Sequence, residues 1–141
     1  MKTTTPLLLA SMVLPCGPVT AVAKCPKAEI TIKQTSDAGS YLADENGMTL
    51  YWYTKDSTGT STCNGPCEAQ RPAYYRDVFR IPKTMNRSDF GTILRSDGKK
   101  QLTFRGYPLY YWKGDRKTGD TGGIAPGGEL QLVDPDNFPN R

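Results

Sequence analysis

Two seven-residue segments of this chain, LYWYTKD at residues 50–56 and LYYWKGD at residues 109–115, repeat almost the same order of residue types. The similarity extends back to a glycine in both copies, so that residues 47–56 align with residues 106–115 without a gap. Self-similarity of this kind predicts two copies of one supersecondary unit. Because no part of the chain keeps a 3.6-residue apolar period over three turns, the repeated unit is predicted to be a β-strand.

Alternation along a strand predicts which side chains of the repeat share a face. In the first copy, Tyr51 and Tyr53 point to one side, and Leu50 and Trp52 point to the other. In the second copy, Tyr110 and Trp112 share one face, and Leu109 and Tyr111 share the other. A strand with two apolar faces is either central and covered on both sides or leaves one face open as a binding platform.

The rest of the chain shows short apolar runs separated by turn signals, which favours hairpins. At 141 residues, the chain supports one domain. The fold class predicted is all-β, a small single domain of two related antiparallel β-hairpin/meander units joined by an irregular connector. The predicted elements are a hairpin over residues 41–54 with a primed turn at Asn46-Gly47, a meander over 92–112 with turns at 96–98 and near Gly106, a last strand at 129–133, and a connector over 71–89 with a short helical turn near 87–90.

Both copies of the repeat end in an aspartate, Asp56 and Asp115, followed by turn-forming residues. Asp56 comes first and Gly59 fourth in the sequence Asp-Ser-Thr-Gly, which is the preferred arrangement for a type I turn. In such a turn the carboxylate accepts hydrogen bonds from nearby backbone N–H groups. The simplest interpretation of each copy is therefore a core strand followed by an aspartate-capped turn.

The first 23 residues differ from the rest and are typical of a cleaved secretory signal. Lys2 is followed by an apolar run over residues 6–15 and by small residues that end in Ala21-Val22-Ala23. A lipid anchor at Cys16 is the second alternative, because a proline precedes this cysteine where lipidation favours a small residue. The predicted organisation is a signal peptide at 1–23, an N-terminal segment with a first strand at 24–40, and a β domain at 41–137 with repeat motifs near 41–67 and 92–123. No transmembrane segment is predicted in the mature chain, because none of its apolar runs approaches about 20 residues.

Three cysteines follow the predicted signal segment. Cys63 and Cys67 flank a short Asn-Gly-Pro turn, and thiols this close in an exported protein tend to be oxidised. A disulfide in so small a loop would contribute only about 2 kcal/mol on the chain-entropy model, so it would fix a local turn. The sequence leaves Cys25 without an obvious partner, and it leaves open a free thiol, an intermolecular bond or competition for one of the other two cysteines.

The chain contains no histidine, which excludes many kinds of site. Ser-His and Cys-His nucleophile pairs, a histidine base and most catalytic zinc sites all need this residue. The net charge is +4, and basic and acidic residues are mixed along the chain. A mixed surface of this kind does not supply the sustained positive potential of a nucleic-acid groove, so no nucleic-acid partner is expected.

The spacing Tyr51-x-Tyr53-x-x-Asp56, repeated as Tyr110-x-Trp112-x-x-Asp115, resembles the Y-x-[FWY]-x-x-D motif of a bacterial family of secreted-repeat lipoproteins of unknown function. The similarity extends from about residue 41 to residue 133 and includes the cysteine pair. The resemblance implies an exported protein, often lipid-anchored, with no established activity. Where the family usually has an aromatic residue and two prolines after the cysteine pair, this chain has the segment QRPA at residues 70–73.

Three classes of function follow from these residues. We favour a non-catalytic exported module that binds an unknown protein or small ligand in the cell envelope, either periplasmic or extracellular, through exposed members of the repeated motif or through the glycine-rich loop at 114–128. No cofactor and no metal are predicted. The candidate binding residues are Tyr51, Tyr53, Asp56, Tyr110, Trp112 and Asp115.

Two alternatives use the acidic residues of the repeat. In a metal-binding or redox-associated protein, Asp56, Asp115 and Asp120 would be oxygen ligands. In a carboxylate-dependent enzyme, Asp56 and Asp115 would form an acid and base pair. We expect neither, because acidic residues in glycine-rich loops most often form turns.

Overall fold

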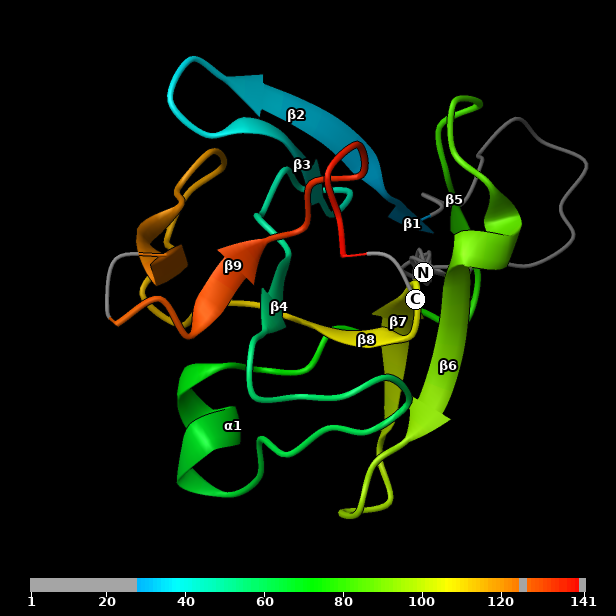
Figure 1. The fold of residues 1–141 in the computed structure, drawn as a ribbon, viewed down its shortest axis with the longest axis vertical. Helices are drawn as coiled ribbons and strands as arrows, with labels where there is room; N and C mark the ends of the chain where they lie inside the picture. Colours follow the sequence, from blue (N-terminus) through cyan, green and yellow to red (C-terminus); the bar gives the residue numbers. More distant parts are fainter. Residues whose placement is uncertain (1–27, 125–126, 140–141) are drawn as a thin grey trace, which may run out of the picture.

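The computed structural model describes residues 28–124 and 127–139, and it consists mainly of antiparallel strands (Figure 1). The predicted signal peptide, Cys16 and Cys25 lie outside the described residues. The strands are β1 (Ala28–Glu29), β2 (Thr31–Thr35), β3 (Gly39–Ala43), β4 (Tyr51–Tyr53), β5 (Phe79–Arg80), β6 (Phe90–Leu94), β7 (Lys100–Phe104), β8 (Tyr107–Tyr110) and β9 (Leu130–Leu132). The helical turns are α1 (Pro66–Gln70), η1 (Arg87–Asp89) and η2 (Gly122–Ile124).

The main sheet has the strand order β6-β7-β8-β4-β9, and its strands are antiparallel. Strands β2 and β3 form a separate antiparallel hairpin, and β1 pairs with β5 in parallel. The all-β class is therefore confirmed. The predicted meander over 92–112 is found as β6, β7 and β8, and the predicted last strand at 129–133 is found as β9.

The two copies of the repeat pair directly with each other in this sheet. In the β4–β8 ladder, Tyr51 lies opposite Tyr110, which is its equivalent in the second copy. Equivalent residues that face each other across an antiparallel ladder are related by a local twofold axis between the two strands. The two motif strands thus lie side by side in one sheet. The predicted hairpin over 41–54 is only partly formed, because β3 pairs with β2 along its length and meets the strand that follows it at the single bridge Ala43–Thr49.

Strand β4 lies inside the sheet between β8 and β9, and alternation along it separates two clusters of buried side chains. Leu50 and Leu109 belong to the larger cluster, together with Leu102 and Phe104. Tyr51, Tyr53 and Tyr110 belong to the smaller cluster on the other side, with Cys63 and Leu130. The predicted division of the repeat into two faces is therefore present, and both faces are covered.

The predicted connector is more ordered than an irregular loop. Residues 70–74 run beside the end of β8, where Pro72 and Gln70 accept the backbone N–H groups of Tyr111 and Lys113. Tyr74 enters between β7 and β8, because its N–H donates to Leu109 and its carbonyl accepts from Leu102. The short helical turn expected near residues 87–90 is present as η1.

One predicted turn has a different geometry. Asn46 does not have positive φ, so Asn46-Gly47 is not a primed turn. The Asp44 carboxylate instead accepts the N–H groups of Asn46 and Met48, which makes an aspartate-centred turn. The two-residue turn with positive φ at both positions, as type I′ requires, is Arg105-Gly106 between β7 and β8.

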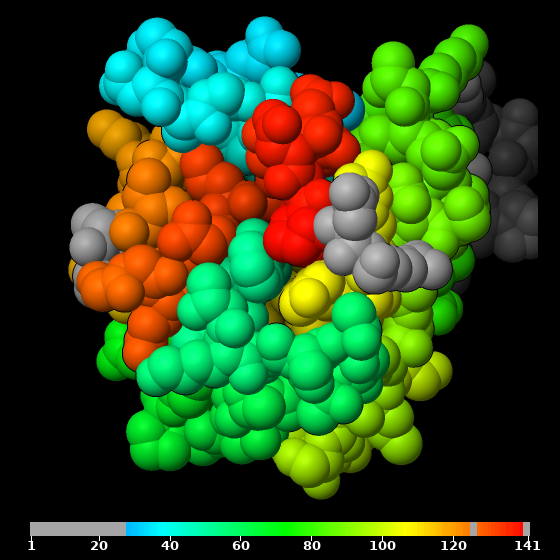
Figure 2. All heavy atoms as spheres, viewed as in Figure 1, coloured from blue at the N-terminus to red at the C-terminus, as the bar shows by residue number. Residues whose placement is uncertain are grey.

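Segments distant in sequence form a common surface around the central strands. In Figure 2 the loop that follows β4 lies against residues near β9, and Lys55 and Glu129 form an ion pair across this boundary with a distance of 2.6 Å. Within the described part of the chain, none of the helices has the length and apolar content needed to span a membrane.

Candidate functional site

The structure places most of the repeated motif inside the fold. Tyr51 and Tyr110 are fully buried, and Tyr53, Asp56 and Asp115 are each exposed by less than a tenth. Trp112 alone of the six candidate residues is half-buried. The expected platform of exposed motif tyrosines is therefore not formed, because these rings are core residues.

The tyrosine of each copy bonds to the aspartate of the other copy. The Tyr51 hydroxyl donates to Asp115 Oδ2 over 2.5 Å. The Tyr110 hydroxyl donates to Asp56 Oδ2 over the same distance. This reciprocal pattern follows from the β4–β8 register, because the local twofold axis places each aspartate beside the tyrosine of the opposite strand. We call these two hydrogen bonds the Tyr–Asp clamps.

The second oxygen of each clamp aspartate holds the loop that follows it. Asp56 Oδ1 accepts both the backbone N–H (2.7 Å) and the hydroxyl (2.8 Å) of Thr62. Asp115 Oδ1 accepts the N–H of Gly122 over 2.9 Å. The aspartates do accept backbone N–H groups, but from residues six and seven positions ahead. The predicted type I turn over residues 56–59 is wrong, because the N–H of Gly59 donates to Gly106 and the turn is closed instead between Ser57 and Thr60.

Burial in this cluster shifts the acid–base properties of its members. Desolvation raises the pKa of Tyr51 and of Tyr110 far above the usual tyrosine value, and the hydrogen bond to a carboxylate raises each one further. Desolvation also raises the pKa of Asp115, against the lowering effect of its hydrogen bonds from Tyr51 and Gly122. The two clamp tyrosines therefore stay neutral well into the alkaline range.

We expect the buried tyrosines to resist ionisation in alkali. Because the folded state keeps these protons above pH 10 while the unfolded chain releases them, the free energy of unfolding should fall as the pH rises above about 10. The affected residues are Tyr51, Tyr74, Tyr110 and Tyr111. A spectrophotometric phenolate titration should show part of the absorbance change only when circular dichroism reports unfolding. In guanidinium chloride, all eight tyrosines should titrate together. Ionisation of every tyrosine near pH 10 in a folded protein would contradict this expectation.

A third tyrosine–aspartate bond lies on the other face of the sheet, and sequence reasoning did not find it. The Tyr111 hydroxyl donates to Asp44 Oδ2 over 2.7 Å, while Asp44 Oδ1 holds its own turn. Asp44 has no counterpart in the second copy, so the repeat contains no signal for this pair. Its geometry nevertheless follows the clamp design, in which one oxygen binds a tyrosine and the other holds a loop.

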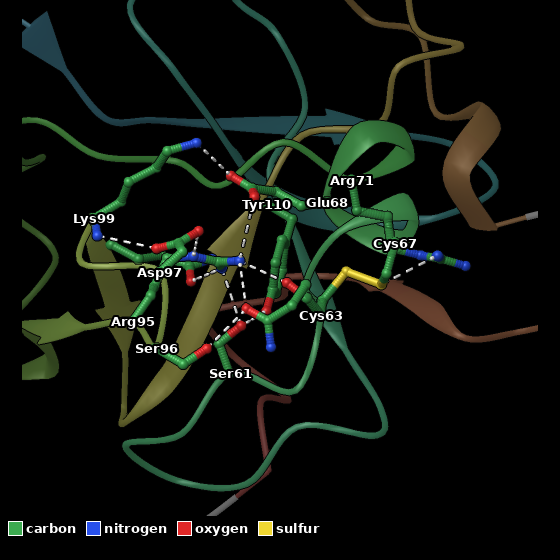
Figure 3. Close-up of polar contacts among 12 residues, drawn as sticks. Ser61, Cys63, Cys67, Glu68, Arg71, Arg95, Ser96, Asp97, Lys99 and Tyr110 are labelled. Carbon is green, nitrogen blue, oxygen red and sulfur yellow. Dashed lines mark hydrogen bonds and ion pairs between the residues drawn. A yellow bond between two sulfur atoms is a disulfide. The ribbon is translucent and has the colours of Figure 1, made fainter.

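Arg95 is the second feature that the sequence does not reveal, and Figure 3 shows its contacts. Its side chain is fully buried, and its guanidinium donates to Gln101 Oε1 (2.6 Å), the Cys63 carbonyl (2.5 Å) and Ser61 Oγ (3.0 Å). Ser61 Oγ in turn lies 2.6 Å from the Tyr110 hydroxyl. Arg95 is therefore linked through Ser61 to the clamp between Tyr110 and Asp56.

The predicted disulfide between Cys63 and Cys67 is present. The Cys63 side belongs to the buried cluster around Tyr110, whereas Cys67 is half-buried at the edge of that cluster. The bond therefore joins the loop after the first clamp to the start of α1 (Figure 3).

The acidic residues considered as metal ligands do not converge. Asp120 uses its carboxylate to accept the N–H groups of Arg116 and Lys117, and Asp115 is committed to its clamp. Among the described residues there is no group of three or more acidic or cysteine side chains arranged to hold a metal ion. Asp56 and Asp115 each face a tyrosine, so the structure does not show them as a facing acid and base pair.

An open surface pocket of about 530 Å³ lies beside the sheet, next to the turn that precedes the second motif. Asp89 and Arg105 approach to 3.6 Å at its wall, and both side chains are partly exposed. Glycines leave much of the wall without side chains. The lining residues are Thr58, Gly59, Ser88, Asp89, Phe90, Gly91, Thr103, Arg105 and Gly106.

The fold and the clamps define a duplicated, disulfide-containing β module in which the repeated motif is a structural core. Comparison with known families agrees with this description. The family described as a secreted repeat of unknown function matches residues 33–74 and 91–125, so each match contains one clamp motif. The chain belongs to this family, and the resemblance seen in its sequence is confirmed. No curated protein and no solved structure shows a significant match.

Proposed function

We propose that this protein is an exported, non-catalytic binding module of the cell envelope, periplasmic or extracellular. The observation that supports this proposal is the use of the motif side chains within the fold. Tyr51, Asp56, Tyr110 and Asp115 hold one another and their loops, so none of these groups is free to transfer a proton or attack a substrate. In this proposal the motif stabilises the scaffold, and the surface around the motif binds the ligand.

We place the binding surface at the pocket beside Arg105. Its volume lies within the range of about 300 to 1,000 Å³ that is common for small-molecule sites. The loop after the first motif contributes Thr58 and Gly59, and the turn before the second contributes Arg105 and Gly106. The N–H of Gly59 donates to the Gly106 carbonyl over 2.7 Å, which joins these two walls. Residues next to the two copies of the motif therefore form two adjoining walls of the pocket.

The pocket chemistry favours an uncharged ligand with several hydroxyl groups, such as a saccharide. Asp89 and Arg105 balance each other in charge, and together they offer strong acceptors and strong donors. Ser88, Thr58 and Thr103 add hydroxyl groups, which both donate and accept. A charged ligand would leave one member of the Asp89–Arg105 pair without compensation.

The variant Arg105→Asn tests this site with little risk to the fold. Asparagine before glycine is preferred in a type I′ turn, so the turn should be kept or stabilised while the guanidinium is lost. Oligosaccharides of N-acetylglucosamine and of glucose would be titrated into isotope-labelled protein, with amide chemical shifts as the readout. We expect chemical-shift changes at residues 88–91 and 103–106. The affinity of Arg105→Asn should be at least tenfold weaker, which corresponds to a loss of about 1.4 kcal/mol in binding free energy.

The matched control is Arg116→Asn, which removes an exposed arginine away from this pocket. It should bind as the unchanged protein does. Shifts that are absent with every saccharide, or that are equal in the two variants, would reject the pocket as a saccharide site. Hydrolysis of any oligosaccharide during the titration would reject the non-catalytic assignment.

A further inference from the structure

The disulfide is asymmetric in its exposure. Cys63 is fully buried, whereas Cys67 is partly exposed, so an external thiol can approach the bond only from the Cys67 side. The rate of thiol–disulfide exchange depends on which sulfur a thiolate can reach, so this asymmetry directs attack to Cys67. The pocket beside Arg105 does not contain either cysteine, so this feature is independent of it.

A cation is fixed beside the accessible sulfur. Arg71 Nη1 lies 3.5 Å from Cys67 Sγ, and the guanidinium is held over the rings of Tyr53 and Trp112 at 5.0 and 5.8 Å. A second guanidinium nitrogen, Nη2, pairs with Glu129 over 2.6 Å. Glu129 also pairs with Lys55, so two cations share one carboxylate and the local charge stays positive. A positive charge at this distance favours a cysteine thiolate.

The second repeat closes its corresponding loop without a disulfide. Its loop from Asp115 to Gly122 is closed by the aspartate bond alone and contains no cysteine. In the first repeat, Asp56 closes the corresponding loop through Thr62, and Arg95 holds the Cys63 carbonyl. Because the backbone is held on its own, the sulfur–sulfur bond can open while the loop stays in place.

From these observations we propose that Cys63 and Cys67 form a redox-active couple that exchanges electrons with an envelope dithiol. A thiolate of the dithiol attacks Cys67 Sγ, the bond to Cys63 breaks, and its electron pair leaves on Cys63 Sγ, which takes a proton. The second thiol of the partner then attacks the mixed disulfide and releases Cys67 as a thiolate beside Arg71. The module gains two electrons, and the partner becomes a disulfide. The reverse reaction uses Cys67 as the nucleophile.

The first experiment measures reduction of the folded, full-length chain with dithiothreitol as the dithiol. The reduced state would be trapped by alkylation at several pH values and read in the tryptic peptide 56–76, which carries Cys63 and Cys67 and excludes Cys25. Trypsin does not cleave after Arg71 because Pro72 follows it. We expect full reduction with unchanged circular dichroism and tryptophan emission, and alkylation at Cys67 well before Cys63.

The second experiment tests the cation through Arg71→Met, Arg71→Lys and the matched control Arg76→Met. Arg76 also pairs with a glutamate and lies over a tyrosine ring, but Cys67 Sγ is paired with Arg71. Loss of the charge should slow alkylation of Cys67 at pH 7 about tenfold and move its pH profile to higher pH, with partial rescue by lysine. Reduction that occurs only with unfolding would overturn the proposal. So would a rate in Arg71→Met equal to that in Arg76→Met.

Discussion

Replacing Asp56 with alanine is expected to lower the free energy of unfolding by about 3 to 5 kcal/mol, one of the two largest effects in this molecule. Asp56 is almost fully buried and accepts three hydrogen bonds, from the Tyr110 hydroxyl and from the N–H and hydroxyl of Thr62. The alanine variant removes the shared acceptor, so the buried Tyr110 hydroxyl loses its carboxylate and the loop that carries Cys63 loses its hold through Thr62. Urea unfolding at neutral pH with the disulfide intact would measure the loss.

A double-mutant cycle separates the clamp from the loop contacts. Tyr110→Phe removes only the hydroxyl that donates to Asp56 and accepts from Ser61, so its effect combined with Asp56→Ala should fall short of the sum by at least about 1 kcal/mol. Asp37→Ala is the control, because Asp37 is exposed and its substitution should change stability by less than about 0.5 kcal/mol. If Asp56→Ala cost no more than Asp37→Ala, the clamps would not stabilise the fold.

The parallel variant Asp115→Ala asks whether the two halves of the repeat are equivalent. Its carboxylate accepts one backbone N–H in addition to the Tyr51 hydroxyl, against two loop donors at Asp56. Its loss should therefore be somewhat smaller than that of Asp56. If both substitutions lower stability and have no other effect, both candidates for carboxylate catalysis are removed.

The strand pattern could be predicted from the sequence because it depends on local alternation. Residues such as Leu50 and Tyr51 point to opposite faces whatever strand lies beside them, so the two clusters could be predicted. The turn at 96–98 was also readable, since Gly98 supplies the positive φ that closes it. Both features are determined by residues that are neighbours in sequence.

The Tyr–Asp clamps could not be predicted, because they depend on pairing between strands that are distant in sequence. Tyr110 meets Asp56 only when β4 and β8 align with Tyr51 opposite Tyr110. The sequence marks these residues as related, but it does not set the register or show which partner each one takes. The exposed platform was expected for this reason, although the same rings fill the core.

Arg95 shows a different limit of sequence reasoning. The mixed charges of the chain were interpreted as a solvated surface, which is the common case for arginine. Arg95 is instead drawn inward by acceptors from three separate segments, Ser61, Cys63 and Gln101. The residues before Cys63 and those after β6 are far apart in sequence, so local composition does not indicate that they converge.

Substitution of Arg95 by methionine should therefore be as damaging as loss of a clamp, with an expected loss of about 3 to 5 kcal/mol. Methionine keeps much of the aliphatic volume but leaves the buried Cys63 carbonyl and Gln101 Oε1 without their donor. The carboxylate of Asp97, paired with Arg95 at 3.3 Å, would also lose its cation. Because Ser61 joins Arg95 to Tyr110, the first clamp should weaken as well.

Lys99→Met is the matched control, because Lys99 pairs with the same glutamate, Glu68, but is 68% exposed. An exposed ion pair contributes at most about 1 kcal/mol, so this variant should unfold close to the unchanged protein. Limited trypsin digestion provides a second readout, since release of the loop should speed cleavage after Lys55 in Arg95→Met alone. Equal stability and equal cleavage in the two variants would mean that the buried guanidinium does not hold the disulfide loop. The loop would then depend on Asp56 and the disulfide, and opening the disulfide would unfold it.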